Sequence, residues 1–176
     1  MKREAMLDDR LKAYNIQRLN FLLVDDNKFM RSIVRNVLGA WGCRNIVEAS
    51  DGEEGLRELK VFPADIVITD WEMAPMDGLQ FVRRIRTDPA SANRFVPVIM
   101  LTAYTEVRRV HAARDAGIHE FLAKPVQPKA LYERICELIE RPRKFVRAST
   151  YFGPDRHRHK KRHHEGPDRR KKDEGL

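Results

Sequence analysis

The stretch Asp-Ile-Val-Ile-Thr at residues 65–69, followed by Asp70, decides the fold of this chain. Four of its five residues have β-branched side chains, and no polar residue alternates with them. Such a run is typical of a strand that is covered on both faces, as in a parallel sheet. A second apolar run, Asn-Phe-Leu-Leu-Val at residues 20–24, also ends in carboxylates, Asp25 and Asp26. Both runs precede amphipathic segments with helical spacing, which predicts strands joined by helices.

This alternation continues through residues 20–140. We expect strands at residues 20–24, 45–49, 65–69, 96–101 and 119–122, and helices at residues 29–40, 53–60, 79–86, 106–116 and 128–140. The pattern predicts an α/β fold, a doubly wound five-stranded parallel sheet in which ligands bind at the carboxyl ends of the strands.

The basic charge lies at the C-terminal end of the chain. The whole chain has 34 Lys+Arg and 26 Asp+Glu, a net charge of +8; residues 1–140 hold 21 of each kind, and residues 141–176 hold 13 and 5. We therefore divide the chain into an N-terminal extension (1–19), a neutral domain (20–140) and a basic tail (141–176). Apolar residues are sparse in the tail, so we expect it to be disordered until it binds an anionic partner.

Two further features concern cellular location. Cys43 and Cys136 are isolated in apolar surroundings and are predicted to be buried thiols rather than a disulfide or metal site. No signal-peptide pattern and no apolar run of about 18 residues is present. We expect a cytoplasmic protein without membrane insertion.

Polar side chains stand where the predicted strands end: Asp25, Asp26, Asp70, Thr102 and Lys124. An isolated Asp after a strand is more often a helix cap, but these strand ends converge at one edge of a parallel sheet. Mg²⁺, which prefers oxygen ligands, would relieve the repulsion among three carboxylates. Together with Lys124 it would neutralise charge during phosphoryl transfer. Asp70 is the candidate nucleophile, giving an aspartyl phosphate.

Four strings match one known family in order and spacing: Leu-Leu-Val-Asp-Asp-Asn, Val-Ile-Thr-Asp-Trp-Glu-Met, Met-Leu-Thr-Ala and Ala-Lys-Pro. Residues 20–140 resemble the receiver domain of two-component response regulators. The resemblance implies a flavodoxin-like sheet order, 2-1-3-4-5, and phosphorylation of Asp70 by a sensor histidine kinase or phosphotransferase. It also implies that the protein is not an enzyme, with at most autophosphatase activity.

The same resemblance implies roles for individual residues. Asp26, Asp70 and the backbone carbonyl of Glu72 would hold Mg²⁺, with Asp25 acting through water. Thr102 and Lys124 would bind the phosphoryl oxygens, and the Lys124–Pro125 bond would be cis.

Among receivers, the chain looks most like the single-domain chemotaxis type, because Met30-Arg31 follows the acidic pair and Trp71 follows Asp70. One departure is Phe121, at the switch position where chemotaxis regulators typically have tyrosine. Phenylalanine has no hydroxyl to solvate when it turns outward, so we expect activation by phosphorylation to be altered, weakened or replaced. Tyr104 either screens the phosphoryl site or is a surface aromatic.

The tail contains Gly-Pro-Asp-Arg twice, at residues 153–156 and 166–169, and each copy leads into a basic stretch. Arg can donate to guanine O6 and N7, and Asp can accept from the opposite guanine edge. Tyr151 and Phe152 either add stacking or anchor the tail against the domain. A doubled motif fits a ligand with two-fold symmetry.

The tail resembles that of the CheY-like Cle effectors, whose arginine-rich extensions bind cyclic di-GMP and which act on the flagellar motor. The resemblance implies a cyclic di-GMP dimer bound within residues 147–173, docking to the flagellar motor switch, and recruitment to the flagellated pole. The implied ligand-binding residues are Arg147, Tyr151, Phe152, Gly153, Pro154, Asp155, Arg156, His157, Arg158, Arg162, Gly166, Pro167, Asp168, Arg169 and Arg170.

Two alternatives stay open. The protein could be a phosphorelay receiver or chemotaxis phosphate sink with an incidental tail, or a nucleic-acid-tethered regulator that needs only the tail's charge. A metal site on the tail histidines is disfavoured by the neighbouring Arg and Lys. No helix-turn-helix pattern follows the domain, so no specific DNA recognition is expected.

Overall fold

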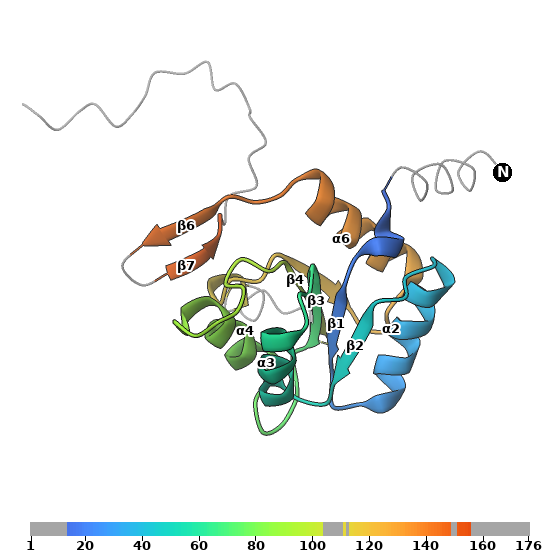
Figure 1. Ribbon diagram of the computed structural model, residues 1–176, viewed down its shortest axis with the longest axis horizontal. Coiled ribbons are helices and arrows are strands. Elements are labelled where there is room, and N and C mark those ends of the chain that lie inside the picture. The colour runs from blue at the N-terminus through green and yellow to red at the C-terminus, as the bar shows by residue number, and fades with distance from the viewer. Residues whose placement is uncertain (1–13, 104–110, 112, 149–150, 156–176) are drawn as a thin grey trace, which may run out of the picture.

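The computed structural model describes residues 14–103, 111, 113–148 and 151–155 (Figure 1). The elements are η1 (Ile16–Arg18), β1 (Phe21–Val24), α2 (Lys28–Ala40), β2 (Ile46–Ala49), α3 (Gly52–Val61), β3 (Ile66–Asp70), α4 (Gly78–Thr87), β4 (Val98–Thr102), β5 (Glu120–Ala123), α6 (Pro128–Glu140), β6 (Phe145–Ala148) and β7 (Tyr151–Pro154). The five predicted strands and four of the predicted helices are present with small shifts at their ends. The helix expected at residues 106–116 lies largely outside the described residues.

The five parallel strands form one sheet in the order β2-β1-β3-β4-β5, which confirms the predicted topology. The register aligns the strand ends: Val24 pairs with Ala49 and Thr69, and Thr102 pairs with Ala123. The residues that follow β1, β3, β4 and β5 therefore meet at one edge of the sheet.

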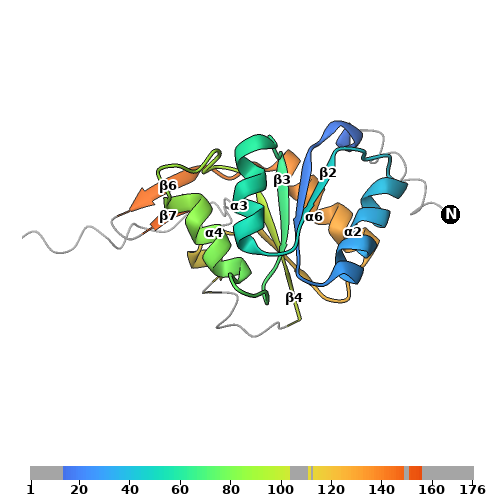
Figure 2. The ribbon, with the colours of Figure 1, turned by 60° about the horizontal axis from the view of Figure 1, so that its bottom comes forward.

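Helices α2 and α6 lie on one face of the sheet, and α3 and α4 on the other (Figure 2). Alternate residues of each strand belong to two separate cores, one on each face. In β1, Phe21 and Leu23 face the core that contains α2 and α6, whereas Leu22 and Val24 face the core that contains α3 and α4. All four β1 residues are buried. This explains the uninterrupted apolar character of the strand in the sequence.

The buried thiols predicted at Cys43 and Cys136 are confirmed, and neither cysteine forms a disulfide. Burial raises the pKa of Cys43 to about 11. Among the described helices, none has the length and apolar content needed to cross a membrane.

The expectation that the chain is disordered from residue 141 onward is wrong for the described part of the tail. Strands β6 and β7 form an antiparallel hairpin beside α4 (Figure 1). Tyr151 is 9% exposed, and its hydroxyl donates a 2.7 Å hydrogen bond to the Pro154 carbonyl. Gly153 is buried, and a side chain there would collide with the Tyr151 hydroxyl and ring and crowd the backbone of Gly117. A few aromatic residues and glycines, rather than high overall hydrophobicity, hold this segment on the domain.

The hairpin covers an unusual buried charge, the guanidinium of Arg86 on α4. Arg86 is 1% exposed and donates hydrogen bonds to the carbonyls of Gly117, Arg94 and Val96. The ring of Phe145 on β6 lies 5.3 Å from the guanidinium carbon. Burial lowers the pKa of Arg86 to about 9. Backbone carbonyls and an aromatic face therefore replace water around this cation.

His119, just before β5, lies under the same hairpin and is 5% exposed. Burial, followed by the positive charge of Arg86, lowers the pKa of His119 to about 3. Its Nδ1 accepts a hydrogen bond from the Val98 amide, as a neutral imidazole can. The region beneath the hairpin thus carries one buried positive charge rather than two.

A buried ion pair fastens the chain between α6 and the hairpin. The Glu120 side chain is 1% exposed, and its Oε1 lies 2.7 Å from the Arg143 guanidinium. Arg134 of α6 lies 3.6 Å from the other oxygen. Glu120 is the first residue of β5, so the pair ties the start of the tail to the edge strand.

We predict that Arg143→Ala lowers the free energy of unfolding by about 2 kcal/mol, because Glu120 then loses its nearest described cation while it stays buried. Urea unfolding at neutral pH measures the effect. Arg141→Ala is the matched control, since Arg141 forms an exposed pair with Glu137 on α6, and a change within about 0.5 kcal/mol is expected. Equal effects of the two substitutions would contradict the prediction.

Candidate functional site

Three carboxylates meet at the carboxyl edge of the sheet, as the sequence predicts. Asp25 and Asp26 follow β1, and Asp70 is the last residue of β3. One oxygen from each of the three groups lies within 4.8 Å of the others. Asp25 and Asp70 are buried, whereas Asp26 is exposed. The cluster is therefore open to solvent on the Asp26 side.

Among the described residues, one cation, Lys124, reaches the cluster from the end of β5. Its Nζ lies 2.7 Å from Asp70 Oδ1 and 3.6 Å from Asp25 Oδ2. The Lys124 amide donates to the Thr102 carbonyl at the end of β4, and the Lys124–Pro125 bond is cis, as the family resemblance implies. The predicted meeting of Asp70, Thr102 and Lys124 at one sheet edge agrees with these contacts.

Backbone amides orient two of the carboxylates. The Asn27 amide donates to Asp25 Oδ1 and the Trp71 amide donates to Asp70 Oδ1, each at 2.8 Å. The second oxygen of Asp25, Oδ2, is buried and accepts no hydrogen bond among the described residues. A buried carboxylate oxygen without a donor is a ready ligand for a cation.

The local electrostatics disfavour three bare carboxylates. Burial raises the pKa of Asp25, and the neighbouring charge of Asp70 raises it further, against the Asn27 amide and Lys124. Burial also raises the pKa of Asp70, although Lys124 and the Trp71 amide oppose the shift. The one positive charge of Lys124 does not balance the negative charge of three carboxylates. The donor set, all oxygen with one unsatisfied atom, is compatible with Mg²⁺.

An open cleft of about 620 Å³ lies beside the cluster. It is lined by Asp26, Trp71, Glu72, Met73, Ala74 and Asp77. Glu72, whose backbone carbonyl is the fourth predicted metal ligand, thus shares the cleft with Asp26. A phosphorylated group can approach the acidic cluster from this side.

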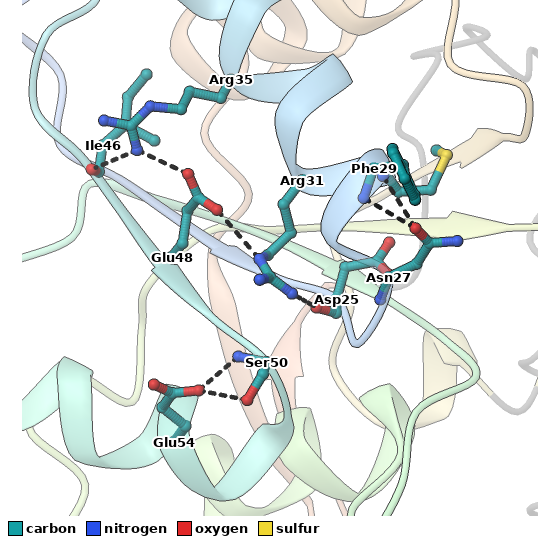
Figure 3. A network of polar contacts seen from close by, with 10 residues as sticks. Asp25, Asn27, Phe29, Arg31, Arg35, Ile46, Glu48, Ser50 and Glu54 are labelled. Carbon is teal, nitrogen blue, oxygen red and sulfur yellow. Dashed lines mark hydrogen bonds and ion pairs between the residues drawn. The ribbon is translucent and has the colours of Figure 1, made fainter.

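An arginine and glutamate network supports the end of β1 (Figure 3). Arg31 on α2 donates to the Asp25 carbonyl at 2.6 Å and to Glu48 on β2 at 3.1 Å. Arg35 donates to the other Glu48 oxygen at 2.7 Å. Hydrogen bonds from Arg35 and Arg31 outweigh the effect of burial and lower the pKa of Glu48. The network fixes the backbone that carries the acidic pair.

Sequence reasoning missed this support. In the sequence, Arg31 stands out only through the resemblance to chemotaxis receivers, and Glu48 is one residue of a predicted strand. Asn27 also has a structural role, because its side chain caps α2 by accepting from the Phe29 and Met30 amides. An Asn just before a predicted helix was an available signal for this cap.

Gly78, at the start of α4, allows the helix to approach Asp70. A side chain at this position would collide with the Asp70 backbone carbonyl. The Gly78 amide donates to the Trp71 carbonyl at 2.8 Å. Asp77 completes the turn as the N-cap of α4, with a reciprocal capping box to Gln80. The loop after Asp70 is thereby folded back onto the site.

The other predicted residues fall in different places. Thr102 is buried at the end of β4, and Phe121 is partly buried against the core on the α3 and α4 side. Tyr104 lies outside the described residues. Among the predicted tail residues, the structure describes Arg147 and residues 151–155. They belong to or adjoin the hairpin, which lies at the other end of the sheet from the acidic cluster, where β4 and β5 begin. The other nine lie outside the described residues, as does the second Gly-Pro-Asp-Arg: Arg156, His157, Arg158, Arg162, Gly166, Pro167, Asp168, Arg169 and Arg170.

Comparison with known proteins agrees with this geometry. Residues 21–136 match the model of the response regulator receiver domain family. The chain is 35% identical over 131 residues to chemotaxis protein CheY-3 of Vibrio cholerae, covering 74% of this chain and 99% of the relative. It is also 35% identical over 120 residues to chemotaxis protein CheY1 of Helicobacter pylori, covering 66% and 94%.

Solved structures show the same fold. CheY4 of Vibrio cholerae aligns with a TM-score of 0.62 at 29% identity, over 68% of this chain and 97% of that one. A response regulator structure from Chloroflexus aurantiacus, titled as putative, aligns with a TM-score of 0.64 at 29% identity, over 70% and 98%. With the sheet order and the Asp70–Lys124 contact, these matches lead to one conclusion. The chain belongs to the response regulator receiver family and is homologous to the CheY chemotaxis regulators.

Proposed function

We propose that the chain is a CheY-like response regulator in which Asp70 accepts a phosphoryl group from a histidine kinase or phosphotransferase. The observation that supports this most directly is the 2.7 Å contact between Asp70 Oδ1 and Lys124 Nζ inside the acidic cluster. In the proposed step, a carboxylate oxygen of Asp70 attacks phosphorus, a P–O bond forms, and the phosphorus–nitrogen bond of the phosphohistidine breaks. The electron pair of that bond goes to the imidazole nitrogen that leaves, and this nitrogen takes a proton from water.

Mg²⁺ would be held by Asp26, Asp70 and the Glu72 carbonyl, with Asp25 acting through water, and would neutralise phosphoryl charge. Both described donors to Asp70, Lys124 and the Trp71 amide, bind Oδ1. We therefore assign the attack to Oδ2. Lys124 and Thr102 then bind the phosphoryl oxygens.

Replacing the nucleophile tests this proposal. Asp70→Asn should abolish phosphorylation by acetyl phosphate in the presence of Mg²⁺, because the amide cannot form the acyl phosphate. Intact-protein mass spectrometry detects the added group. Asp65→Asn, at the opposite end of the β3 region, is the matched control and should be phosphorylated like the wild type. A phosphorylated Asp70→Asn chain would contradict the assignment.

Mg²⁺ binding can be followed through Trp71, which lines the cleft and whose amide binds Asp70. Asp26→Asn should weaken Mg²⁺ binding at least about tenfold, as expected for loss of a charged oxygen ligand. A fluorescence titration measures the affinity. Glu133→Gln, an exposed charge on α6, should leave it unchanged. Equal affinities for wild type and Asp26→Asn would count against the ligand set.

The raised carboxyl pKa values predict a pH-dependent stability difference without Mg²⁺. Asp25→Asn should raise the melting temperature by about 4 °C at neutral pH, because it removes a buried negative charge. The folded pKa of Asp25 lies above its ordinary value of 3.8, so the folded wild type binds the proton more tightly. The advantage of the variant should therefore shrink as the pH falls from neutrality through the raised pKa toward 3.8. Thermal unfolding across pH in a chelating buffer would reveal a constant difference if the prediction is wrong.

We also propose that the C-terminal segment binds cyclic di-GMP and directs docking to the flagellar motor switch, with effects on motility and surface attachment. Support comes from the doubled Gly-Pro-Asp-Arg and from the net charge of the chain, +8, which residues 141–176 carry. The hairpin gives this segment a fixed start, since the Asp155 amide donates to the Lys144 carbonyl at 2.7 Å. Recruitment to the flagellated pole would follow from docking.

The structure alters one part of this proposal. Gly153 and Pro154 of the first copy are buried in the hairpin. They cannot wrap a ligand while the hairpin is docked. The two copies are therefore proposed to play unequal roles, the first anchored on the domain.

Two alternatives remain distinguishable. A phosphorelay receiver or phosphate sink would keep its function after removal of residues 156–176. A nucleic-acid-tethered regulator would bind DNA of any sequence, with strong salt dependence.

Calorimetric titration of the full chain with cyclic di-GMP tests the tail proposal. Wild type should bind, and Asp168→Asn should lose about tenfold in affinity because a carboxylate that reads the guanine edge is removed. Glu174→Gln, beyond residue 173 and outside the repeat, is the control and should bind normally. No heat with cyclic di-GMP, together with binding to random DNA, would overturn the proposal.

A further inference from the structure

We infer that the docked hairpin and the loop before β4 form one nucleotide-binding surface, in which Arg94 and Phe95 of the domain join Arg147 and Phe152 of the hairpin. We call this set the hairpin patch. It would take a planar base together with a phosphodiester. The inference rests on the proposed binding of cyclic di-GMP and adds the domain's own residues to that site.

The patch has a fixed backbone on both sides. On the hairpin, Arg147 of β6 pairs directly with Phe152 of β7, so both side chains stand on the same face. On the domain, Arg86 and Arg94 hold each other: the Arg86 guanidinium donates to the Arg94 carbonyl, and Arg94 Nε donates to the Arg86 carbonyl, both at 2.8 Å. The Arg94 guanidinium is thus oriented before any ligand arrives.

Two guanidinium groups lie near one aromatic ring. The guanidinium carbon of Arg94 lies 4.4 Å from the centroid of the Phe152 ring, and that of Arg147 lies 5.8 Å from it. Among the described residues, neither Arg94 nor Arg147 forms an ion pair with a carboxylate. Their positive charges are therefore available to an anionic group.

Phe95 adds an exposed aromatic surface. Its ring meets Phe145 edge-on at 4.9 Å and Phe152 edge-on at 5.5 Å, yet the residue is 57% exposed. Phe95 thus exposes apolar surface beside two arginines that form no ion pair among the described residues. This arrangement suits a ligand that combines a flat ring with negative charge.

A guanine nucleotide has both parts. Its base can stack on Phe95 or on the guanidinium plane of Arg94, and its phosphodiester can pair with Arg94 and Arg147. The chain leaves the hairpin at Asp155, directly after β7, and continues into the basic stretch. Ligand held on the hairpin patch would therefore lie at the start of the segment that carries the second Gly-Pro-Asp-Arg.

Calorimetry on the full chain with cyclic di-GMP tests the inference. Arg94→Ala, Arg147→Ala and Phe95→Ser should each weaken binding about tenfold, the loss expected for a stacking or charge-paired contact. Arg83→Ala, an exposed arginine of α4, and Phe29→Ser, an 83% exposed phenylalanine of α2, are the matched controls and should bind like wild type.

Arg94 also supports the hairpin, so Arg147→Ala and Phe95→Ser separate ligand contact from folding. Hydrogen exchange of the Asp155 amide, which bonds to Lys144, reports whether the hairpin stays docked. Weaker binding with that amide still protected supports the patch. If wild type binds but Arg147→Ala and Phe95→Ser bind equally well, the hairpin patch is wrong and the tail proposal stands. If wild type does not bind, the proposed function itself fails.

Discussion

The concentration of negative charge at the carboxyl edge of the sheet is the constraint on which the rest of the site depends. Asp25 and Asp70 are buried close together, and burial raises the pKa of both. Such an arrangement persists only if the surrounding structure fixes it. The Lys124 ammonium and the amides of Asn27 and Trp71 offset part of this negative charge. The buried Asp25 Oδ2 has no hydrogen-bond donor among the described residues and is suited to a cation.

At the other end of the sheet, where β4 and β5 begin, the buried charge is positive. Arg86 has carbonyl acceptors and an aromatic ring around it, and its pKa is lowered to about 9. The hairpin supplies the aromatic cover and is fastened through Arg143 to Glu120. This segment therefore completes the domain, although its composition resembles that of the tail that follows.

The sequence predicts features that depend on local pattern and misses those that depend on contacts between residues far apart in the chain. Strands such as residues 66–70 are continuous apolar runs, so their type, order and polar ends follow from local pattern. The hairpin was missed because its stability comes from contacts with Arg86, Gly117 and Glu120, which lie far away in the chain. Support for Asp25 from Arg31 and Glu48 was missed for the same reason, since only the folded sheet brings β2 beside α2.

Strands β4 and β5 connect the acidic end of the sheet, where phosphorylation of Asp70 is proposed, with the end that the hairpin covers. Thr102 and Lys124 stand where these strands end, whereas Val96, His119 and Glu120 meet the hairpin or its anchors where they begin. Shared strands alone do not couple two sites, because a rigid sheet has one arrangement. Coupling requires an element with two arrangements that both ligands bias. Phe121 is partly buried on β5 and stands at the switch position that the family resemblance implies, so it is a candidate for such an element. If Phe121 keeps one position, the proposed phosphorylation and the proposed nucleotide binding would act independently of each other.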